Sequence, residues 1–188
     1  MQTQELNGIE ADLEELLTNN HLEPSKLSTF QRIILTTDGT LTEILESYLM
    51  EKIQIIKLSE KPLSITQPIH SLDLKTGDDV IERKILLQGK ISRRNWIYAE
   101  SVIVPSRLDE IFRERLLKSQ EPIGRLWVEH RVETFKEIID SARERAGDLS
   151  NYFKIKKEDK ILSRTYRVFS NRQPIMIITE KFPESYFV

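Results

Sequence analysis

The sequence predicts an α+β fold in which one antiparallel β-sheet is covered by helices. Strand-like runs follow one another without a regular βαβ alternation, short turns join them as hairpins, and helix-like segments are inserted between them. The 188 residues suit one domain with a substantial core. We therefore expect a single domain over residues 1–188, with residues 1–27 as an N-terminal helical extension and a ligand site between sheet and helices.

The first quarter of the chain is predicted to be helical. Residues 9–17 carry apolar side chains at helical spacing. Ser28, with Gln31 three residues later, forms a capping-box pattern that opens a brief helical turn before the turn at 37–39. Thr40 is then placed to cap another helix. The apolar face of that helix would contain Leu41, Ile44, Leu45, Tyr48 and Leu49.

The middle of the chain is predicted to contribute three strands. Residues 53–58 are rich in β-branched side chains and predict a strand, followed by a loop bounded by Pro62 and Pro68. Residues 80–87 and 95–104 are two further strand candidates. Because the segment between them is short and polar, an antiparallel hairpin is the simplest connection.

Helices are predicted to interrupt the strands after residue 104. Residues 108–117 have helical spacing, and the loop at 122–124 ends that pattern. The apolar run 126–128 indicates the start of a strand, and residues 133–145 are predicted to form a helix.

Two final strands, 161–169 and 175–182, are predicted to form a C-terminal hairpin. Residues 175–178 are apolar without interruption, which is typical of a strand covered on both faces. Glu180 follows this run directly. A carboxylate in such a setting is expected to be at least partly buried and to need a partner.

Composition excludes several kinds of function. The 28 Lys and Arg residues against 30 Asp and Glu leave no positive excess for nucleic acid or an anionic membrane. Cysteine is absent, the three histidines are scattered, and no GxSxG, GxGxxG or Walker pattern occurs. We expect no metal, no cofactor, no nucleic-acid partner and no membrane partner, in a cytoplasmic monomer or small homo-oligomer without a signal peptide.

Arginines and glutamates within the predicted strands are the candidate site residues: Arg83, Glu100, Arg167 and Glu180. Any one of them is explained equally well by the exposed face of a sheet. Together they indicate more, since an arginine fork binds a carboxylate through two parallel hydrogen bonds and a buried glutamate can accept one from a hydroxyl. This combination suits a small aromatic or cyclic hydroxy acid.

Five motifs carry a family resemblance, in order along the chain. They are Thr37–Thr42, Arg83–Leu87, Trp96–Pro105, Pro122–Arg125 and Gln173–Pro183. With these motifs the sequence resembles the chorismate pyruvate-lyases and related chorismate-lyase-like proteins.

The resemblance implies an antiparallel sheet with helical flaps that enclose the ligand. It also implies cleavage of chorismate into 4-hydroxybenzoate and pyruvate, without metal or organic cofactor, as an early step of quinone biosynthesis. Arg83 would hold the ring carboxylate, backbone amides around Leu41 and Ile123 would complete that anion site, and Glu180 would meet the ring hydroxyl.

One segment departs from the family pattern. Where an arginine is expected near the second substrate carboxylate, this chain has Glu100 between Ala99 and Ser101. Arg167 or Arg125 would have to compensate, and we hypothesise that Arg167 does. Two alternatives remain: a small-metabolite-binding module of the same fold without catalysis, and a divergent enzyme acting on another carboxylic acid.

Overall fold

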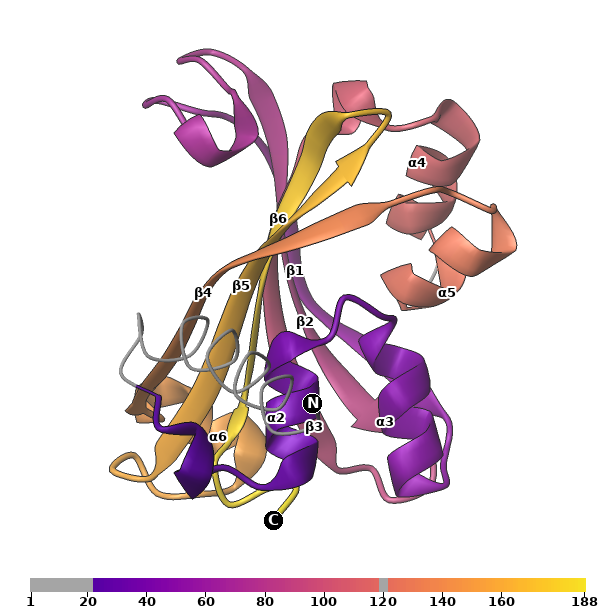
Figure 1. Ribbon diagram of the computed structural model, residues 1–188. Coiled ribbons are helices and arrows are strands. Elements are labelled where there is room, and N and C mark those ends of the chain that lie inside the picture. The colour runs from indigo at the N-terminus through magenta and orange to yellow at the C-terminus, as the bar shows by residue number, and fades with distance from the viewer. Residues whose placement is uncertain (1–21, 119–121) are drawn as a thin grey trace, which may run out of the picture.

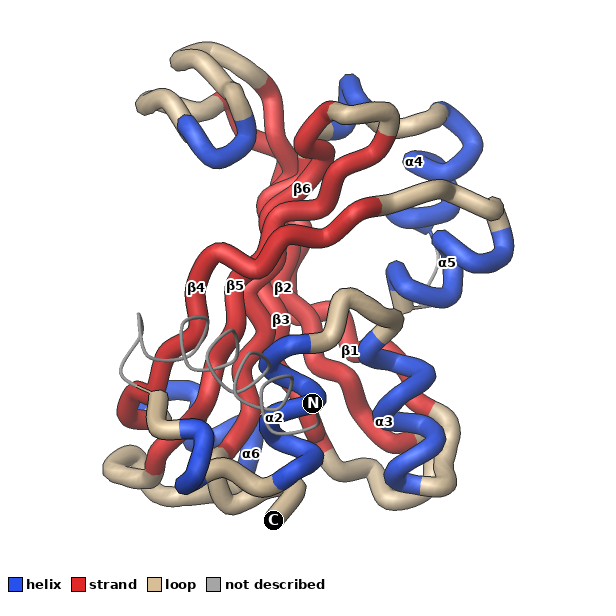
Figure 2. Tube along the Cα trace, in the orientation of Figure 1, coloured by secondary structure: helices blue, strands red, loops and turns tan. Residues whose placement is uncertain are grey.

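A computed structural model describes residues 22–118 and 122–188, in which six strands form one antiparallel sheet. The strand order is β1-β2-β3-β6-β5-β4, so that the C-terminal strand lies at the centre beside β3 (Figures 1 and 2). The strands are β1 (Ile53–Ser64), β2 (Asp79–Gly89), β3 (Asn95–Ile103), β4 (Phe135–Arg145), β5 (Lys160–Ser170) and β6 (Gln173–Pro183). This confirms the predicted α+β class.

Helices lie on both sides of the sheet, but most of them cover one face. The helices are α2 (Thr29–Thr36), α3 (Leu41–Leu49), α4 (Glu110–Lys118), α5 (Ile123–Glu129) and the short α6 (Ser150–Phe153). We call the face covered by α2 to α5 the helical face. The segment around the 3-10 turn η2 (His70–Leu72) projects on the other side of the sheet from α4 and α5 (Figure 1). In the described part of the chain, no helix is long and apolar enough to cross a membrane.

The helical face carries two separate hydrophobic clusters. The α2–α3 cluster packs Ile34, Leu35 and Leu45 against strand residues that include Ile97 and Phe182. The α4–α5 cluster packs helix residues that include Phe112, Leu126 and Trp127 against Ile103, Val168 and Met176. The helical face of the sheet therefore has two apolar halves, and a band of strand residues that belongs to neither cluster lies between them.

Most of the predicted elements are confirmed. The Ser28 hydroxyl accepts a hydrogen bond from the Gln31 backbone amide at 3.0 Å and the Gln31 side chain accepts one from the Ser28 amide at 2.9 Å, so the capping box is present. Thr40 is the N-cap residue of α3. The β2–β3 and β5–β6 hairpins and the helix α4 also occur as expected. The predicted helix at 9–17 lies outside the described residues.

Two predictions after residue 122 are wrong. Residues 133–145 form the strand β4 instead of a helix, because a register shift between Ile138 and Asp140 breaks the alternation of side chains and brings apolar residues to helical spacing. The run 126–128 belongs to α5, not to a strand. In addition, β1 continues through Pro62, which the edge position of this strand allows.

Candidate functional site

A row of polar residues crosses the sheet between the two hydrophobic clusters. Residues that pair in register share a face, and side chains alternate along a strand. On β3, Ala99 therefore lies on the same face as Ile97 and Ile103, which belong to the two clusters. Following the register from β1 to β4, this polar row contains Glu60, Arg83, Ser101, Ala99, Glu180, Arg164 and Ser141.

Glu180 is buried and has two partners. Its side chain lies on the helical face, and the residue is 6% exposed. Arg164 Nε donates a hydrogen bond to Glu180 Oε2 at 2.7 Å, and the Tyr166 hydroxyl donates one to Oε1 at 3.0 Å. This confirms the expectation that the carboxylate is removed from water and paired. Each carboxylate oxygen has a second lone pair, so Glu180 can still accept a hydrogen bond from a ligand hydroxyl.

Arg164 joins the polar row to the turn before α3. It is 1% exposed, and its Nη1 donates to the Thr37 carbonyl at 2.8 Å. Burial lowers the pKa of Arg164, but the nearby Glu180 carboxylate and Tyr166 outweigh it, and the pKa is raised above the ordinary arginine value. Its Nη2 is buried and has no hydrogen-bond partner among the described residues. Arg164 therefore presents one unused donor within the site.

Arg83 is the other buried cation of the row. It is 2% exposed, and its Nε lies 3.5 Å from Glu60 Oε2, too far for a good hydrogen bond. Arg83 Nε and Nη2 have no hydrogen-bond partner among the described residues, and burial lowers the pKa of the guanidinium. Unused buried donors are costly, so this guanidinium is suited to an anionic ligand.

Small residues form the floor between Arg83 and Glu180. Only β3 separates β2 from β6, and it presents Ala99 and Ser101 toward the helices. Arg83 pairs with Ser101 and Glu180 pairs with Ala99, two residues along β3. With neighbouring strands about 4.8 Å apart and a rise of about 3.4 Å per residue, the Cα atoms of Arg83 and Glu180 are separated by roughly 12 Å. A six-membered ring with a polar group at each end is matched to this span.

Lys136 and Trp127 adjoin this floor, and sequence reasoning did not identify either as a site residue. Lys136, on β4, donates from Nζ to the Gly39 carbonyl at 2.7 Å and lies 5.3 Å from the centroid of the Trp127 ring. Trp127 Nε1 is buried without a hydrogen-bond partner among the described residues. Burial lowers the pKa of Lys136, although the Glu180 carboxylate opposes that effect. A correct strand assignment for β4 would have revealed Lys136.

The beginnings of α3 and α5 meet over the site. Leu41 is the first residue of α3 and is buried, and Ile123 is the first residue of α5. Gly124 packs so closely on Thr40 that a Cβ at Gly124 would lie 2.4 Å from Thr40 Cγ2. The pair of helices α4 and α5 therefore forms a flap that rests on the start of α3.

Arg125 also joins α5 to α3, on the outer side of the contact between Gly124 and Thr40. Its Nη2 donates to Glu46 Oε1 on α3 at 2.7 Å. Burial raises the pKa of the Glu46 carboxyl, but hydrogen bonds from Lys52 and the Ile53 amide, together with the charge of Arg125, outweigh burial and lower it. Arg125, one of the two cations expected to compensate for Glu100, thus links α5 to α3.

Arg167 and Glu100 do not lie with Glu180. On β5, Arg167 alternates with Tyr166, and its guanidinium bonds to Glu137 at 3.0 Å and to the Ser71 carbonyl beside η2. Glu100 alternates with Ala99 on β3 and lines a cavity of about 200 Å³ on that same face. The expectation that these two residues share the site of Glu180 does not hold, because neighbouring strand residues point to opposite faces.

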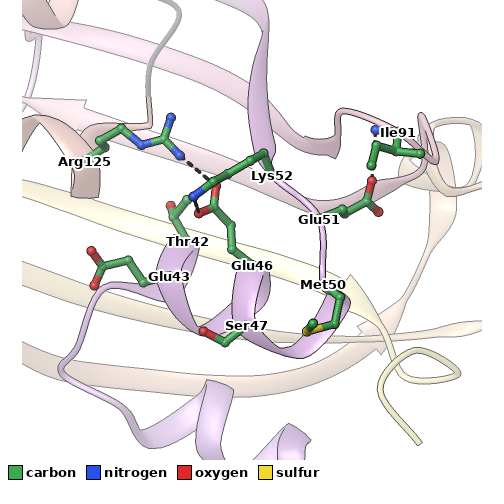
Figure 3. A pocket seen from close by; sticks show the side chains of 9 residues that line it. All are labelled: Thr42, Glu43, Glu46, Ser47, Met50, Glu51, Lys52, Ile91 and Arg125. Atoms are coloured by element: carbon green, nitrogen blue, oxygen red, sulfur yellow. Dashed lines mark hydrogen bonds and ion pairs between the residues drawn. The ribbon is translucent and has the colours of Figure 1, made fainter.

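A larger cavity, of about 590 Å³, lies on the outer side of α3 (Figure 3). Its lining includes Glu46, Met50, Lys52, Ile91 and Arg125. Both cations already pair with the Glu46 carboxylate, at 2.8 Å for Lys52 and 2.7 Å for Arg125. This cavity is therefore less suited to an anionic ligand than the polar row, whose buried guanidinium groups retain unused donors.

The fold and the polar row define a domain with buried, incompletely bonded arginine side chains between a sheet and a pair of helices, an arrangement suited to a small anionic ligand. Comparison with known families gives the particular group: residues 35–187 match the family described as Chorismate pyruvate-lyase Rv2949c-like, and the chain belongs to that family.

Curated relatives agree with this assignment. The chain is 34% identical over 181 residues to a chorismate pyruvate-lyase of Mycobacterium leprae (strain TN), an alignment that covers 91% of this chain and 83% of the relative. It is 31% identical over 181 residues to a chorismate pyruvate-lyase of Mycobacterium tuberculosis (strain ATCC 25618 / H37Rv), covering 88% of this chain and 85% of the relative.

Solved structures share the fold at low sequence identity. The effector domain of PhnF from Mycobacterium smegmatis matches with a TM-score of 0.60 at 11% identity, over 79% of this chain and 90% of that chain. The ligand-binding domain of a putative GntR-family transcriptional regulator from Bordetella bronchiseptica matches with a TM-score of 0.54 at 13% identity, over 70% of this chain and 83% of that one. These matches show the fold alone.

Proposed function

We propose that this chain is a chorismate pyruvate-lyase that converts chorismate into 4-hydroxybenzoate and pyruvate at the polar row. The observation that carries the proposal is the arrangement of Arg83 and Glu180 at opposite ends of the floor formed by Ala99 and Ser101. The guanidinium has unused buried donors, and the carboxylate retains acceptor capacity. Family membership and the named relatives support the same substrate.

In this proposal Arg83 binds the ring carboxylate, and the backbone around Leu41 and Ile123 closes that end of the site. Glu180 accepts a hydrogen bond from the ring hydroxyl. Loss of the enolpyruvyl side chain and of a ring hydrogen makes the ring aromatic, so the reaction needs little acid or base catalysis. The chain contributes mainly by holding the side chain over the ring and excluding water under the flap.

The biological setting is part of the proposal. The product would feed quinone biosynthesis in the cytoplasm, and the lack of cysteine fits a reducing compartment. No nucleic acid is required in this proposal, and the near balance of charge supports that.

The test is direct incubation of the purified protein with chorismate. Release of 4-hydroxybenzoate is followed by chromatography, and pyruvate is followed by its reduction in a coupled lactate dehydrogenase assay. We expect equal amounts of the two products from the wild-type chain. Lys84→Met, which alters an exposed residue of β2, should retain the activity, whereas Arg83→Met should lose it. Absence of both products at high enzyme concentration would overturn the proposal.

A small-metabolite-binding module is the second candidate, favoured by the fold shared with effector and ligand-binding domains of regulators. Tight binding of 4-hydroxybenzoate in calorimetry, without turnover of chorismate, would select this candidate. Turnover of a different cyclic carboxylic acid, with none of chorismate, would instead select a divergent enzyme.

A further inference from the structure

We propose that Lys136, together with Arg164 Nη2 and Trp127 Nε1, binds the second carboxylate of the substrate, the one on the enolpyruvyl side chain. This inference rests on the proposed function. It adds residues that contact the substrate but not the product 4-hydroxybenzoate. It also replaces Arg167 as the source of the second cation.

The substitution pattern of the chorismate ring determines where a cation that binds the second carboxylate must lie. The molecule is a dianion with one carboxylate on ring carbon 1 and the other on the enolpyruvyl group at carbon 3. The hydroxyl is on carbon 4, next to that group. If Arg83 binds the ring carboxylate and Glu180 meets the hydroxyl, the second carboxylate falls beside Glu180, at the end of the site remote from Arg83. A dianion requires a cation at that end, because Glu180 alone would repel it.

Lys136 and Arg164 both lie beside Tyr166 at that end of the polar row, and Lys136 also lies beside Trp127. Lys136 Nζ lies 5.8 Å from the centroid of the Tyr166 ring and 5.3 Å from that of Trp127. The Arg164 guanidinium lies 5.0 Å from the Tyr166 ring centroid. Both cations therefore border the residue whose hydroxyl donates to Glu180.

The donors also have bonding capacity to spare. Lys136 carries three N–H groups, and the Gly39 carbonyl is the one hydrogen-bond acceptor found for them in residues 22–118 and 122–188. Arg164 Nη2 and Trp127 Nε1 are both buried without partners among the described residues. Arg164 is 1% exposed, so its unused donor points into protein interior and not into solvent. Donors in this state are matched to an acceptor with several lone pairs, which a carboxylate supplies.

The charges of the row leave one cation in excess, because Arg83 lies beside Glu60 and Arg164 pairs with Glu180, whereas Lys136 forms no ion pair among the described residues. Arg83, Arg164 and Lys136 supply three cations, and Glu60 and Glu180 supply two carboxylates. Asp38, near Lys136, is exposed and therefore well hydrated. A monoanion such as 4-hydroxybenzoate uses Arg83 and Glu180 and leaves Lys136 without a ligand carboxylate, whereas chorismate uses all three.

The experiment separates these two ends. KM and kcat for chorismate, and the Kd of 4-hydroxybenzoate from calorimetry, are measured for the wild type, Lys136→Met, Lys136→Arg and the exposed control Lys84→Met. Loss of one charge-assisted contact of about 1.5–3 kcal/mol should raise KM for chorismate about 10- to 100-fold in Lys136→Met. The Kd of 4-hydroxybenzoate should change by less than about threefold, which is the size of effect expected from a surface substitution away from the binding site. Lys136→Arg should restore most of the chorismate affinity.

The outcomes distinguish the inference from the proposed function. A wild-type chain that turns over no chorismate fails the proposed function itself. If the wild type is active and Lys136→Met leaves KM unchanged, or weakens chorismate and 4-hydroxybenzoate equally, the assignment of Lys136 is overturned. Equal weakening would mean that Lys136 acts only by holding the Gly39 turn.

Discussion

Arg164 Nε and Glu180 Oε2 lie 2.7 Å apart, and the side chains of both residues are almost fully buried. The pair joins two neighbouring central strands on the helical face, and Tyr166 completes the coordination of the carboxylate. A buried ion pair of this kind is expensive to break and inexpensive to replace as a unit. Its geometry fixes the direction of Glu180 in the candidate site.

Removing one member of this pair should destabilise the fold strongly. Arg164→Met leaves Glu180 buried without its cation, and we expect a loss of about 3–5 kcal/mol in the free energy of unfolding, measured by urea denaturation. Arg167→Met is the matched control, because Arg167 pairs with Glu137 in a partly exposed position. It should cost about 0–1 kcal/mol.

The double variant Arg164→Met with Glu180→Leu should recover much of that loss, since no unpaired charge remains. Equal destabilisation by Arg164→Met and Arg167→Met would mean that the buried pair has no special role in stability.

Arg83→Lys tests the fork geometry at the other end of the site. The substitution keeps the positive charge but removes the parallel donors, so binding of 4-hydroxybenzoate should weaken about 10-fold or more, as measured by calorimetry. Arg167→Lys is the control on the opposite face and should leave this Kd unchanged. Unaltered affinity in Arg83→Lys would show that the carboxylate is held elsewhere.

Gly124→Ala tests the close contact of α5 with the start of α3. The new Cβ would lie 2.4 Å from Thr40 Cγ2, so α5 must shift away from α3, and kcat for chorismate should fall with loss of enclosure. The double variant with Thr40→Ser removes the obstructing methyl group and should restore activity. Thr40→Ser alone should be nearly neutral, since the Thr40 side chain makes no capping hydrogen bond.

The pH profile of chorismate turnover should report Lys136. Burial lowers the pKa of this lysine, and its charged neighbours are Glu180, Arg164 and Asp38. Because the protonated ammonium binds the dianion, kcat/KM should be full below that pKa and fall as pH rises through it, at a pH below the ordinary lysine range. The pKa of Tyr166 is raised well above its usual value, so Tyr166 does not account for a fall there.

Lys136→Arg should remove this alkaline fall, since arginine stays charged. A profile with the same fall in Lys136→Arg would assign it to another group.

Glu100→Gln and Arg167→Ala should leave kcat/KM for chorismate within about twofold of the wild type, because both side chains lie on the face away from Arg83 and Glu180. Steady-state kinetics check this. A tenfold loss in either variant would mean that the opposite face takes part in the reaction.

The sequence alone predicted the strands that position Arg83 and Glu180, because their apolar runs and turn residues agree with each other. The sequence also predicted the helices that begin after Ser28 and Thr40. At both positions the local capping pattern and the tertiary structure favour the start of a helix. The burial of Glu180 followed from the apolar run before it.

Lys136, which we propose as the second cation, lies in a segment whose sequence pattern is misleading for a physical reason. The bulge near Ile138 shifts the alternation of β4 by one residue, and charged residues on this edge strand resemble the polar face of a helix. Lys136 was therefore hidden in a predicted helix. The composition of β5 does not show whether Arg164 or Arg167 faces the helices, because that depends on the register of the strand.

The polar row also divides the helical face into two apolar halves, one under α2 and α3 and the other under α4 and α5. Each half has its own packed side chains, so the cohesion of one does not depend on every contact of the other. The sheet and the α2–α3 cluster can thus stay folded while the helices α4 and α5 separate from the sheet in a local opening. In the proposed function, entry of substrate and release of product would require only that local opening, and its free energy is expected to be smaller than that of unfolding the whole chain.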